Sequence, residues 1–303
     1  MSESTRETRC GFVAVLGAPN VGKSTLVNAM VGGKVSIVTP KVQTTRTRVR
    51  GIAIAGEAQV VFVDTPGIFA PRRRLDRAMV AAAWTEAGDA DAVLLLVDAA
   101  RGLSGETEAI LNRLAESRPA RPMLAINKID LVPRETLLAL AAEANARLPF
   151  ERTFMISAAR GDGVPAILET VAAMMPAGPW LFPEDQLSDM PDRLLAAEIT
   201  REQVMLQLQQ ELPYAMTVET DSWEERPDGS VKIHQTLYVR KAGQKSIVLG
   251  HGGTRIKAIG EAARRELERL LGVRVHLFLF VKVRENWADD PERYRDLGLD
   301  FNA

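Results

Sequence analysis

Apolar residues fall into short continuous runs along about the first 175 residues, and amphipathic stretches separate these runs. Such runs are typical of strands buried on both faces of a parallel sheet, and the stretches between them have helical spacing. The predicted strands cover 11–17, 59–63, 92–98, 122–127 and 152–157. The predicted helices cover 23–32, 74–88, 104–118, 133–147 and 164–175. This alternation predicts a doubly wound α/β domain with a mostly parallel sheet.

The alternation stops at 176–192, where four prolines and several acidic residues indicate a linker or a boundary. Beyond it the pattern predicts a helix at 193–211, strands at 214–223 and 231–240, a helix at 254–271 and a strand at 273–284. This α-β-β-α-β order predicts a second, α+β domain. We expect a first domain over 1–177, a linker over 178–192, and a second domain with a C-terminal tail over 193–303.

Composition narrows the class of protein. The 303 residues correspond to about two domains, and 46% hydrophobic with 25% charged residues is typical of a soluble globular chain. The single cysteine, Cys10, excludes an internal disulfide framework and fits a reducing compartment. No apolar run reaches the roughly 18 residues of a membrane span, and the N-terminus lacks the apolar region of a signal peptide. We therefore expect a cytoplasmic protein.

Charge is unevenly distributed although the net charge is only −1. Residues 178–230 hold 12 acidic and 3 basic residues, whereas residues 230–284 hold 12 basic and 3 acidic residues and all three histidines. Residues 285–303 are acidic again, with 6 acidic against 2 basic residues. A charged run is often only a solvated face. The basic block also contains the loop at 250–253 described below, which favours an anionic polymer as partner.

The segment GAPNVGKS at 17–24 fits the phosphate-binding pattern G-x-x-x-x-G-K-[ST], between a predicted strand and a predicted helix. Gly17 and Gly22 permit backbone conformations that direct N–H groups at phosphates. The N-terminus of the following helix adds its positive end. Lys23 is expected to reach the β- and γ-phosphates, and the Ser24 hydroxyl to ligate Mg²⁺.

DTPG at 64–67 ends an apolar strand. Asp64 is placed to hold Mg²⁺ through water, and the Gly67 N–H to sense the γ-phosphate. A first switch loop is expected within 38–48, where a threonine hydroxyl would complete the magnesium shell. Thr45 is our choice and Thr44 the alternative, and a purely structural role as turn caps stays open for both.

NKID at 127–130 ends another predicted strand. The Asp130 carboxylate can accept hydrogen bonds from the ring N–H and the exocyclic amine of guanine, donors that adenine does not offer there. Asn127 is expected to brace the base and the stem of Lys128 to cover it. In the SAA loop at 157–159, the backbone N–H of Ala158 is expected to meet the guanine O6. The order of these motifs predicts a GTPase.

Position 68 holds isoleucine where Ras-type enzymes carry a water-orienting glutamine. Isoleucine cannot polarise water, so we expect slow intrinsic hydrolysis or help from another group. Asn20 is a candidate ligand for a monovalent cation, K⁺, placed where an arginine finger otherwise brings positive charge. A role of Asn20 in stabilising the loop alone stays open.

IVLGHGGTRIKAIG at 247–260 carries G-x-x-G at 250–253 between an apolar stretch and a helix. The glycines let a nucleic-acid backbone approach closely, as in a KH module, which clamps about four single-stranded nucleotides. Ile256 and Ile259 are expected to face the core, and Arg255 and Lys257 to point outward. A purely structural turn is the alternative.

These motifs define two predicted sites. Catalytic roles are assigned to Lys23, Thr45, Gly67 and Asn20, and Mg²⁺ binding to Ser24, Thr45 and Asp64. The GTP-binding residues are Gly17, Ala18, Pro19, Asn20, Val21, Gly22, Lys23, Ser24, Thr25, Asp64, Thr65, Pro66, Gly67, Ile68, Asn127, Lys128, Ile129, Asp130, Ser157, Ala158 and Ala159. The RNA-binding residues are Gly250, His251, Gly252, Gly253, Arg255 and Lys257.

With GAPNVGKS, QTTR at 43–46, DTPGI, NKID, the SAA loop and VLGHGGTRIKAIG in this order, nearly the whole chain resembles the Era family of ribosome-assembly GTPases. The resemblance implies a Ras-like domain followed by a type II KH domain. It also implies binding to the 3′ end of 16S rRNA and a role in 16S rRNA processing and 30S subunit biogenesis. Peripheral association with the inner membrane is implied for some members. His251 departs from the lysine that such loops often carry.

Two other functions fit parts of the pattern. An RNA-binding assembly module could hold GTP mainly as a structural ligand, a reading to which Ile68 gives weight. A P-loop ATPase or kinase is disfavoured by NKID. We expect a monomer.

Overall fold

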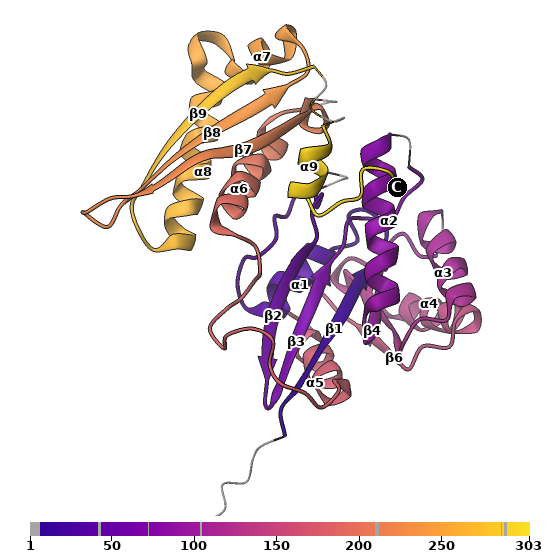
Figure 1. Cartoon of the computed structure of the whole chain (residues 1–303). Helices are drawn as coiled ribbons and strands as arrows, with labels where there is room; N and C mark the ends of the chain where they lie inside the picture. Colours follow the sequence, from indigo (N-terminus) through magenta and orange to yellow (C-terminus); the bar gives the residue numbers. More distant parts are fainter. Residues whose placement is uncertain are drawn as a thin grey trace, which may run out of the picture. The chain divides into compact units, whose positions relative to one another are not determined.

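The structure is a computed structural model that describes residues 7–41, 44–71, 73–103, 105–209, 212–285, 287 and 290–303. Gln43 of the QTTR motif lies outside these residues. The chain forms two compact units (Figure 1). The first comprises Met1–Ser36, Thr45–Asp189 and Leu297–Ala303, and the second comprises Ile37–Thr44 and Met190–Asp296.

A six-stranded sheet in the order β2-β3-β1-β4-β5-β6 forms the centre of the first unit. Its strands are β1 (Arg9–Leu16), β2 (Val49–Ala55), β3 (Ala58–Asp64), β4 (Ala92–Asp98), β5 (Pro122–Asn127) and β6 (Arg152–Met155). All neighbours run parallel except β2, which pairs antiparallel with β3. The sequence pattern missed β2, an edge strand joined to β3 by a tight turn at Gly56 (φ 60).

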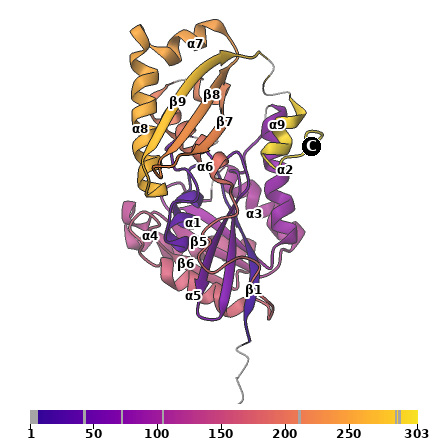
Figure 2. The same ribbon diagram turned by 60° about the vertical axis from the view of Figure 1, so that its left-hand side comes forward.

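Five α-helices connect the strands of the first unit: α1 (Lys23–Val31), α2 (Arg74–Asp89), α3 (Glu106–Ser117), α4 (Arg134–Arg147) and α5 (Val164–Met174). Helices α1 and α5 pack together against β2 and β3, while α2 packs against β1 (Figures 1 and 2). Strands β3 and β4 are buried along their whole length, as their continuous apolar runs predicted. The predicted doubly wound α/β domain is confirmed.

The second unit has a three-stranded sheet, β7-β8-β9, with helices α6 and α8 packed side by side (Figure 2). Its strands are β7 (Met216–Glu225), β8 (Val231–Val239) and β9 (Val275–Val283). Its helices are α6 (Asp192–Gln207), α7 (Ala242–Leu249), α8 (Thr254–Leu271) and α9 (Pro291–Asp296). The order of elements from α6 to β9 is therefore α-β-β-α-α-β, and the predicted α-β-β-α-β lacked α7. That helix is only eight residues long and holds Gly243, which obscures its helical pattern.

The predicted linker at 178–192 differs from the structure, in which the first unit extends to Asp189. Gln59 explains the difference: its side-chain oxygen accepts hydrogen bonds from the backbone N–H groups of Leu181 and Phe182, at 2.9 and 3.0 Å. The backbone of Ile52 also donates to the carbonyl of Leu187, at 2.9 Å. These hydrogen bonds hold the proline-rich segment against β2 and β3. The last residues, from Leu297, likewise belong to the first unit.

Candidate functional site: a phosphate loop, a base-recognition loop and a GxxG loop

The phosphate loop lies between β1 and α1, and two of its glycines are required by close contacts. Gly17 has φ 152, and a Cβ there would lie 2.7 Å from the carbonyl oxygen of Leu96. Gly22 has φ 100, and a Cβ there would lie 2.4 Å from the Asn127 amide nitrogen. Larger residues at either position would push the loop away from the neighbouring strands β4 and β5.

Lys23 opens α1 and is buried. Its ammonium donates hydrogen bonds to the carbonyls of Gly17 and Ala18, both at 3.1 Å. Burial lowers the pKa of Lys23 to about 8, against the opposing charges of Asp64 and Glu106. The ammonium is thus held inside the loop in a site that an anionic ligand would stabilise.

Three hydroxyl groups gather around Asp64, which is fully buried at the end of β3. Ser24 and Ser36 donate to Asp64 Oδ2, both at 2.7 Å, and Thr45 Oγ1 lies 3.4 Å from the same oxygen. Ser24 and Thr45 lie 2.9 Å apart, Oγ to Oγ1. Burial raises the pKa of Asp64, and these hydrogen bonds oppose the shift.

The residues around Asp64 fit a magnesium ion. The second carboxylate oxygen, Oδ1, is buried and has no hydrogen-bond partner among the described residues. A carboxylate with hydroxyl ligands is the oxygen-rich set that Mg²⁺ prefers. Of the two threonines considered for this site, Thr45 lies here, whereas Thr44 bonds to Thr39 and to the carbonyl of Lys41.

Ser36 escaped the sequence analysis because no phosphate-binding motif includes it. Its backbone is held by Asn28 of α1, which accepts from the Ser36 N–H at 2.9 Å and donates to its carbonyl at 2.8 Å. Ser36 therefore reaches Asp64 from a loop fixed to α1. The only signal in the sequence was its position shortly before the expected switch.

The DTPG loop lies against the phosphate loop. Thr65 donates to the carbonyl of Val15 at 2.7 Å, and the backbone N–H of Ile68 donates to the carbonyl of Gly17 at 3.1 Å. A Cβ at Gly67 would lie 3.0 Å from the Pro19 Cα, so glycine permits this approach. The Ile68 side chain is buried, and no polar group replaces the glutamine at that position.

Asn127 joins the base-recognition loops. Its amide donates to the carbonyl of Val21 at 2.8 Å and accepts from the N–H of Ala158 at 2.9 Å. The Ala158 N–H, which we expected to meet guanine O6, is therefore bonded to Asn127 in this structure. Asn127 lies at the end of β5 and links the phosphate loop to the SAA loop.

Lys128 adopts a left-handed backbone conformation, φ 64, and turns its ammonium back to the phosphate loop. It donates to the carbonyl of Asn20 at 2.7 Å and pairs with Asp98 at 2.6 Å. Asp98 ends β4 and is buried, and the sequence analysis did not include it. The sequence did contain one indication of its role, since Asp98 is an aspartate at the end of an apolar strand, as Asp64 is.

Asp130 lies beside Ser157 and Arg160. The Ser157 side chain, followed by the charges of Arg160 and Lys128, lowers the pKa of the Asp130 carboxyl. The Arg160 guanidinium lies 3.7 Å from it and is 64% exposed. An ionised carboxylate at this edge is the group that guanine recognition requires. The four predicted motifs thus follow the carboxyl ends of β1, β3, β5 and β6.

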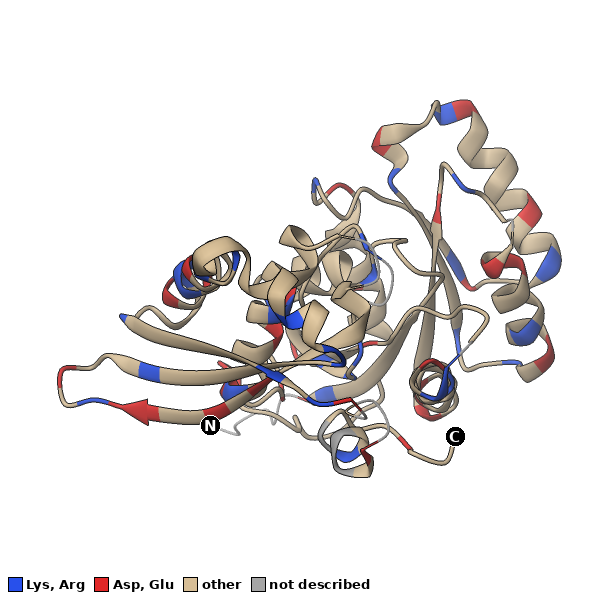
Figure 3. Ribbon diagram, turned by 90° about the horizontal axis from the view of Figure 1, so that it is seen from above, with Lys and Arg blue, Asp and Glu red and all other residues tan. Residues whose placement is uncertain are grey.

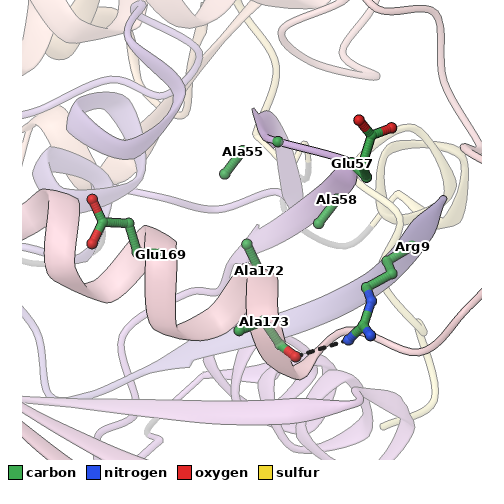
Figure 4. Close-up of a pocket in the computed structure, with 8 residues that line it drawn as sticks. Arg9, Ala55, Glu57, Ala58, Glu169, Ala172 and Ala173 are labelled. Atoms are coloured by element: carbon green, nitrogen blue, oxygen red, sulfur yellow. Dashed lines mark hydrogen bonds between the residues drawn. The ribbon is translucent and has the colours of Figure 1, made fainter. Parts of the chain in front are cut away.

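A hollow of about 360 Å³ lies elsewhere on this unit, next to the N-terminal end of β1 and the β2–β3 turn (Figure 4). Arg9, Glu57, Glu169 and several alanines line it, and Arg9 donates to the carbonyl of Ala173 at 2.9 Å. Because the nucleotide motifs follow the opposite ends of the strands, this hollow is separate from the phosphate site.

The GxxG loop connects α7 and α8 through a single turn, His251–Gly253. Gly250 (φ 72, ψ 173) has a conformation available essentially only to glycine, and a Cβ there would lie 2.8 Å from the Arg255 Cβ. Gly252 and Gly253 also have positive φ, but a Cβ at either would meet no described atom within 4 Å. Their surface is therefore open to a close-approaching backbone.

The predicted faces of α8 are confirmed, but its charge is smaller than expected. Ile259 is buried, Ile256 packs partly buried against the core, and Arg255 and Lys257 are exposed. The Arg255 guanidinium also donates to the carbonyl of Ile247 at 2.7 Å, at the end of α7. Three of the basic residues pair along α8 with its three acids: Arg264 with Glu268, Arg265 with Glu261 and Arg269 with Glu266. The charge offered to an anion is therefore smaller than the sequence count. Lys241, Lys245, Lys257, Arg274 and Lys282 form no ion pair among the described residues.

Comparison with known proteins decides the family. A family model described as a 50S ribosome-binding GTPase matches residues 12–128, and a KH domain model matches residues 211–288. GTPase Era of Bradyrhizobium sp. (strain BTAi1) is 62% identical over 295 residues, which are 97% of this chain and 96% of that protein. GTPase Era of Mesorhizobium japonicum is 63% identical over 298 residues, 98% of this chain and 96% of that protein.

The chain belongs to the Era family of GTPases. It is a GTPase with a C-terminal KH domain, as the motifs predicted. Among solved structures, Era of Aquifex aeolicus bound to GDP and AlF₄⁻ superposes with a TM-score of 0.90 at 38% identity, covering 96% of this chain and 99% of that one. An Era structure in complex with MgGDPNP and nucleotides 1506–1542 of 16S ribosomal RNA matches with the same TM-score, identity and coverage. No helix among the described residues of this Era-family chain is long and apolar enough to span a membrane.

The lowered pKa of Lys23 predicts that nucleotide binding takes up a proton at alkaline pH. Phosphates beside Lys23 favour its charged form, so its pKa rises on binding. Below pH 8 Lys23 is protonated in the free protein and in the nucleotide complex. Above about pH 8 Lys23 keeps its proton only in the complex. Affinity should therefore fall as pH rises above 8, by up to about tenfold per unit.

Calorimetry at pH 9 in two buffers of different ionisation enthalpy measures this uptake. We expect up to one proton per nucleotide beyond that of a Lys23→Arg control, whose side chain keeps its charge at this pH. An uptake equal to that of the control would contradict the role of Lys23.

Proposed function

We propose that this chain is a GTP-hydrolysing switch that binds the 3′ end of 16S rRNA through its KH domain and acts in 16S rRNA processing and 30S subunit biogenesis. The Era complex with MgGDPNP and 16S rRNA nucleotides supports both ligands. The open GxxG loop and the complete set of nucleotide motifs in this chain support the same pair of ligands.

One observation carries the proposal that the two ligands are coupled. The segment Ile37–Thr44 belongs to the KH unit, although the residues on either side of it, Ser36 and Thr45, both reach Asp64. Ile37 is buried in the core cluster of the KH unit with Ile199 and Leu267. The first part of the expected switch loop, up to Thr44, therefore belongs to the RNA-binding unit, whereas Thr45 belongs to the first unit.

Polar contacts with α6 hold this segment. The Val38 N–H donates to Glu202 Oε1 at 2.9 Å, and the Lys41 ammonium donates to the carbonyls of Met205 and Leu208 at the C-terminal end of α6. Arg201, ion-paired with Glu198, donates to the carbonyl of Thr44. A cation at the C-terminal end of a helix is stabilised by its dipole.

We expect loss of the γ-phosphate to change the contacts of Thr45 and Asp64. Thr45 directly follows Thr44, the last residue of the segment that α6 holds, so a shift of Thr45 would also move that segment. A measurement of RNA affinity with GTP analogue and with GDP, and of each nucleotide's affinity with and without RNA, tests the proposal. The two coupling factors must be equal. We expect a factor of 5 or more, typical of coupled sites.

The alternative function, an RNA-binding module in which GTP is mainly structural, gives a coupling factor of one and turnover unaffected by RNA. Lys41→Ala separates the two proposals further. It should lower the coupling factor severalfold while each ligand alone binds nearly as in the wild type. Lys34→Ala, which alters a lysine outside the segment, is the matched control. A coupling factor of Lys41→Ala equal to that of the wild type would contradict the proposal that the segment Ile37–Thr44 couples the two ligands.

We propose that Mg²⁺ is held by Ser24, Thr45 and Asp64, where it would neutralise charge on the β- and γ-phosphates. We also propose K⁺ near Asn20. The backbone of Asn20 is left-handed, φ 63, and its carbonyl is bonded to Lys128. The buried Ile68 cannot orient water, so stabilisation of the transition state has to come from another group, for which we propose the cation.

Hydrolysis should be faster in KCl than in NaCl at equal ionic strength, and Asn20→Ala should abolish this difference. Single-turnover rates with excess protein measure it. Equal wild-type rates in the two salts would remove the cation hypothesis. A cytoplasmic location, peripheral membrane association and a monomeric state also stay proposals, which fractionation and sedimentation can test.

A further inference from the structure

We propose that the outer face of the KH sheet is a second RNA-binding surface, on which unpaired bases stack. This inference rests on the proposed RNA-binding function but concerns a different face from the GxxG loop. The surface consists of His234 and Tyr238 on β8 and Phe278 and Phe280 on β9, with basic residues at both ends; we call it the aromatic strip.

Alternation along the two strands separates this face from the core. Ile233 and Leu237 of β8 and Val275 and Val281 of β9 are buried in the clusters that α6 and α8 cover. The residues between them point the other way. Phe278 and Phe280 are 44% and 48% exposed, a large apolar area for two neighbouring positions on one strand.

The rings are held together. The parallel register pairs His234 with Phe278 and Thr236 with Phe280. The His234 ring centroid lies 4.9 Å from that of Phe278 and 5.8 Å from that of Phe280, with tilts of 47° and 40°. His234 Nε2 is buried here and has no hydrogen-bond partner among the described residues. Rigid exposed rings on a sheet lose little entropy when a base stacks on them.

Charge on the sheet favours a polyanion over an apolar partner. The register pairs Lys232 with His276 before the rings and Tyr238 with Lys282 after them. The Arg284 guanidinium lies 5.9 Å from the centroid of the Tyr238 ring. Lys232 is ion-paired with Glu224 and Arg284 with Asp290, so among these three cations Lys282 alone forms no ion pair with the described residues. Aromatic residues interleaved with cations are the pattern of sheets that bind single-stranded nucleic acid.

The distribution of acidic residues also indicates on which side of the sheet the RNA backbone lies. Strand β7 carries only acidic charges, and β8 and β9 carry only basic ones (Figure 3). The sheet order β7-β8-β9 places β9 at an edge. Phosphates are therefore repelled from β7 and accommodated along β9, with bases lying inward over Phe278 and Phe280. Because α7 and α8 pack on the other side of β9, RNA leaving the GxxG loop can continue over this edge.

The test measures binding of the full chain, with GTP analogue, to an RNA of 16S nucleotides 1506–1542. The Phe278→Ala/Phe280→Ala double variant should bind at least about tenfold more weakly, because each lost stacking contact weakens binding severalfold or more. Phe280→Trp, which keeps a stacking surface, should bind as the wild type does. Leu206→Ala is the control: Leu206 is as exposed as Phe280, at 48%, but lies on α6.

Crosslinking with 4-thiouridine-substituted RNA should label peptides that contain Phe278 or Phe280. Unchanged affinity of the double variant, with loss of binding in Gly252→Asp, would overturn the aromatic strip and leave the proposed function intact. Absence of RNA binding by the wild type would overturn both. A change in sedimentation of the free double variant with unchanged RNA affinity would assign the surface to a second copy and also overturn the proposal.

Discussion

Replacing Asp130 by asparagine should transfer the preference of this GTPase from guanine to xanthine nucleotides. Ser157, Arg160 and Lys128 lower the pKa of the carboxyl, and we expect the carboxylate to accept from two guanine donors. An amide accepts only from the ring N–H, and its NH₂ group faces the guanine amine. Xanthine has an oxygen at that position, which an amide can donate to.

Two hydrogen bonds to a charged acceptor contribute about 3–6 kcal/mol, so GTP affinity should fall by roughly 10²- to 10⁴-fold. XTP affinity should rise, and Asp130→Ala should lose GTP without gaining XTP. Competition binding with GTP, XTP and ATP measures the three preferences. Arg160→Ala, which removes only the exposed cation at 3.7 Å, is the control and should alter GTP affinity little. GTP selectivity retained in Asp130→Asn would mean that another group reads the base.

Gly252→Asp should abolish most RNA binding and leave GTP hydrolysis in the absence of RNA unchanged. Gly252 has φ 56 and open space around its Cβ position, and aspartate tolerates the left-handed conformation better than most residues. The variant should therefore fold. A carboxylate about 4 Å from a phosphate costs about 1–4 kcal/mol in a partly solvated site, which weakens RNA binding by roughly fivefold to several hundredfold.

Gly229→Asp is a matched control, because Gly229 has φ 78, open space around its Cβ position and an exposed turn in the same unit. Filter binding across a salt series measures both variants. The control should keep wild-type affinity. Equal effects of the two variants would show that general charge rather than the GxxG loop controls binding. The dependence of wild-type RNA affinity on salt concentration reports how many phosphates the protein neutralises. We expect fewer than the 12 basic residues of 230–284 suggest, because three arginines of α8 are ion-paired within the helix.

Strongly periodic elements were predictable from sequence, and weakly marked ones were not. Strands β3 and β4 are buried on both faces, so each residue needs to be apolar and the pattern is continuous. Strand β2 is an edge strand and α7 has eight residues, so neither needs a long apolar pattern. Lys41, Glu202 and Ser36 were missed for a different reason: their roles depend on partners distant in the chain.

The sequence by itself determined the chemistry of the nucleotide loops. The roles predicted for Gly17, Gly22, Lys23 and Asp130 depend on local backbone geometry and side-chain type, which a short motif specifies. Tertiary structure alone decided that Ile37–Thr44 is part of the KH unit, that the Ala158 N–H donates to Asn127, and that His234, Phe278 and Phe280 share one open face. Contacts between residues 31 to 164 positions apart depend on strand register and helix packing, and no local pattern in the chain encodes them.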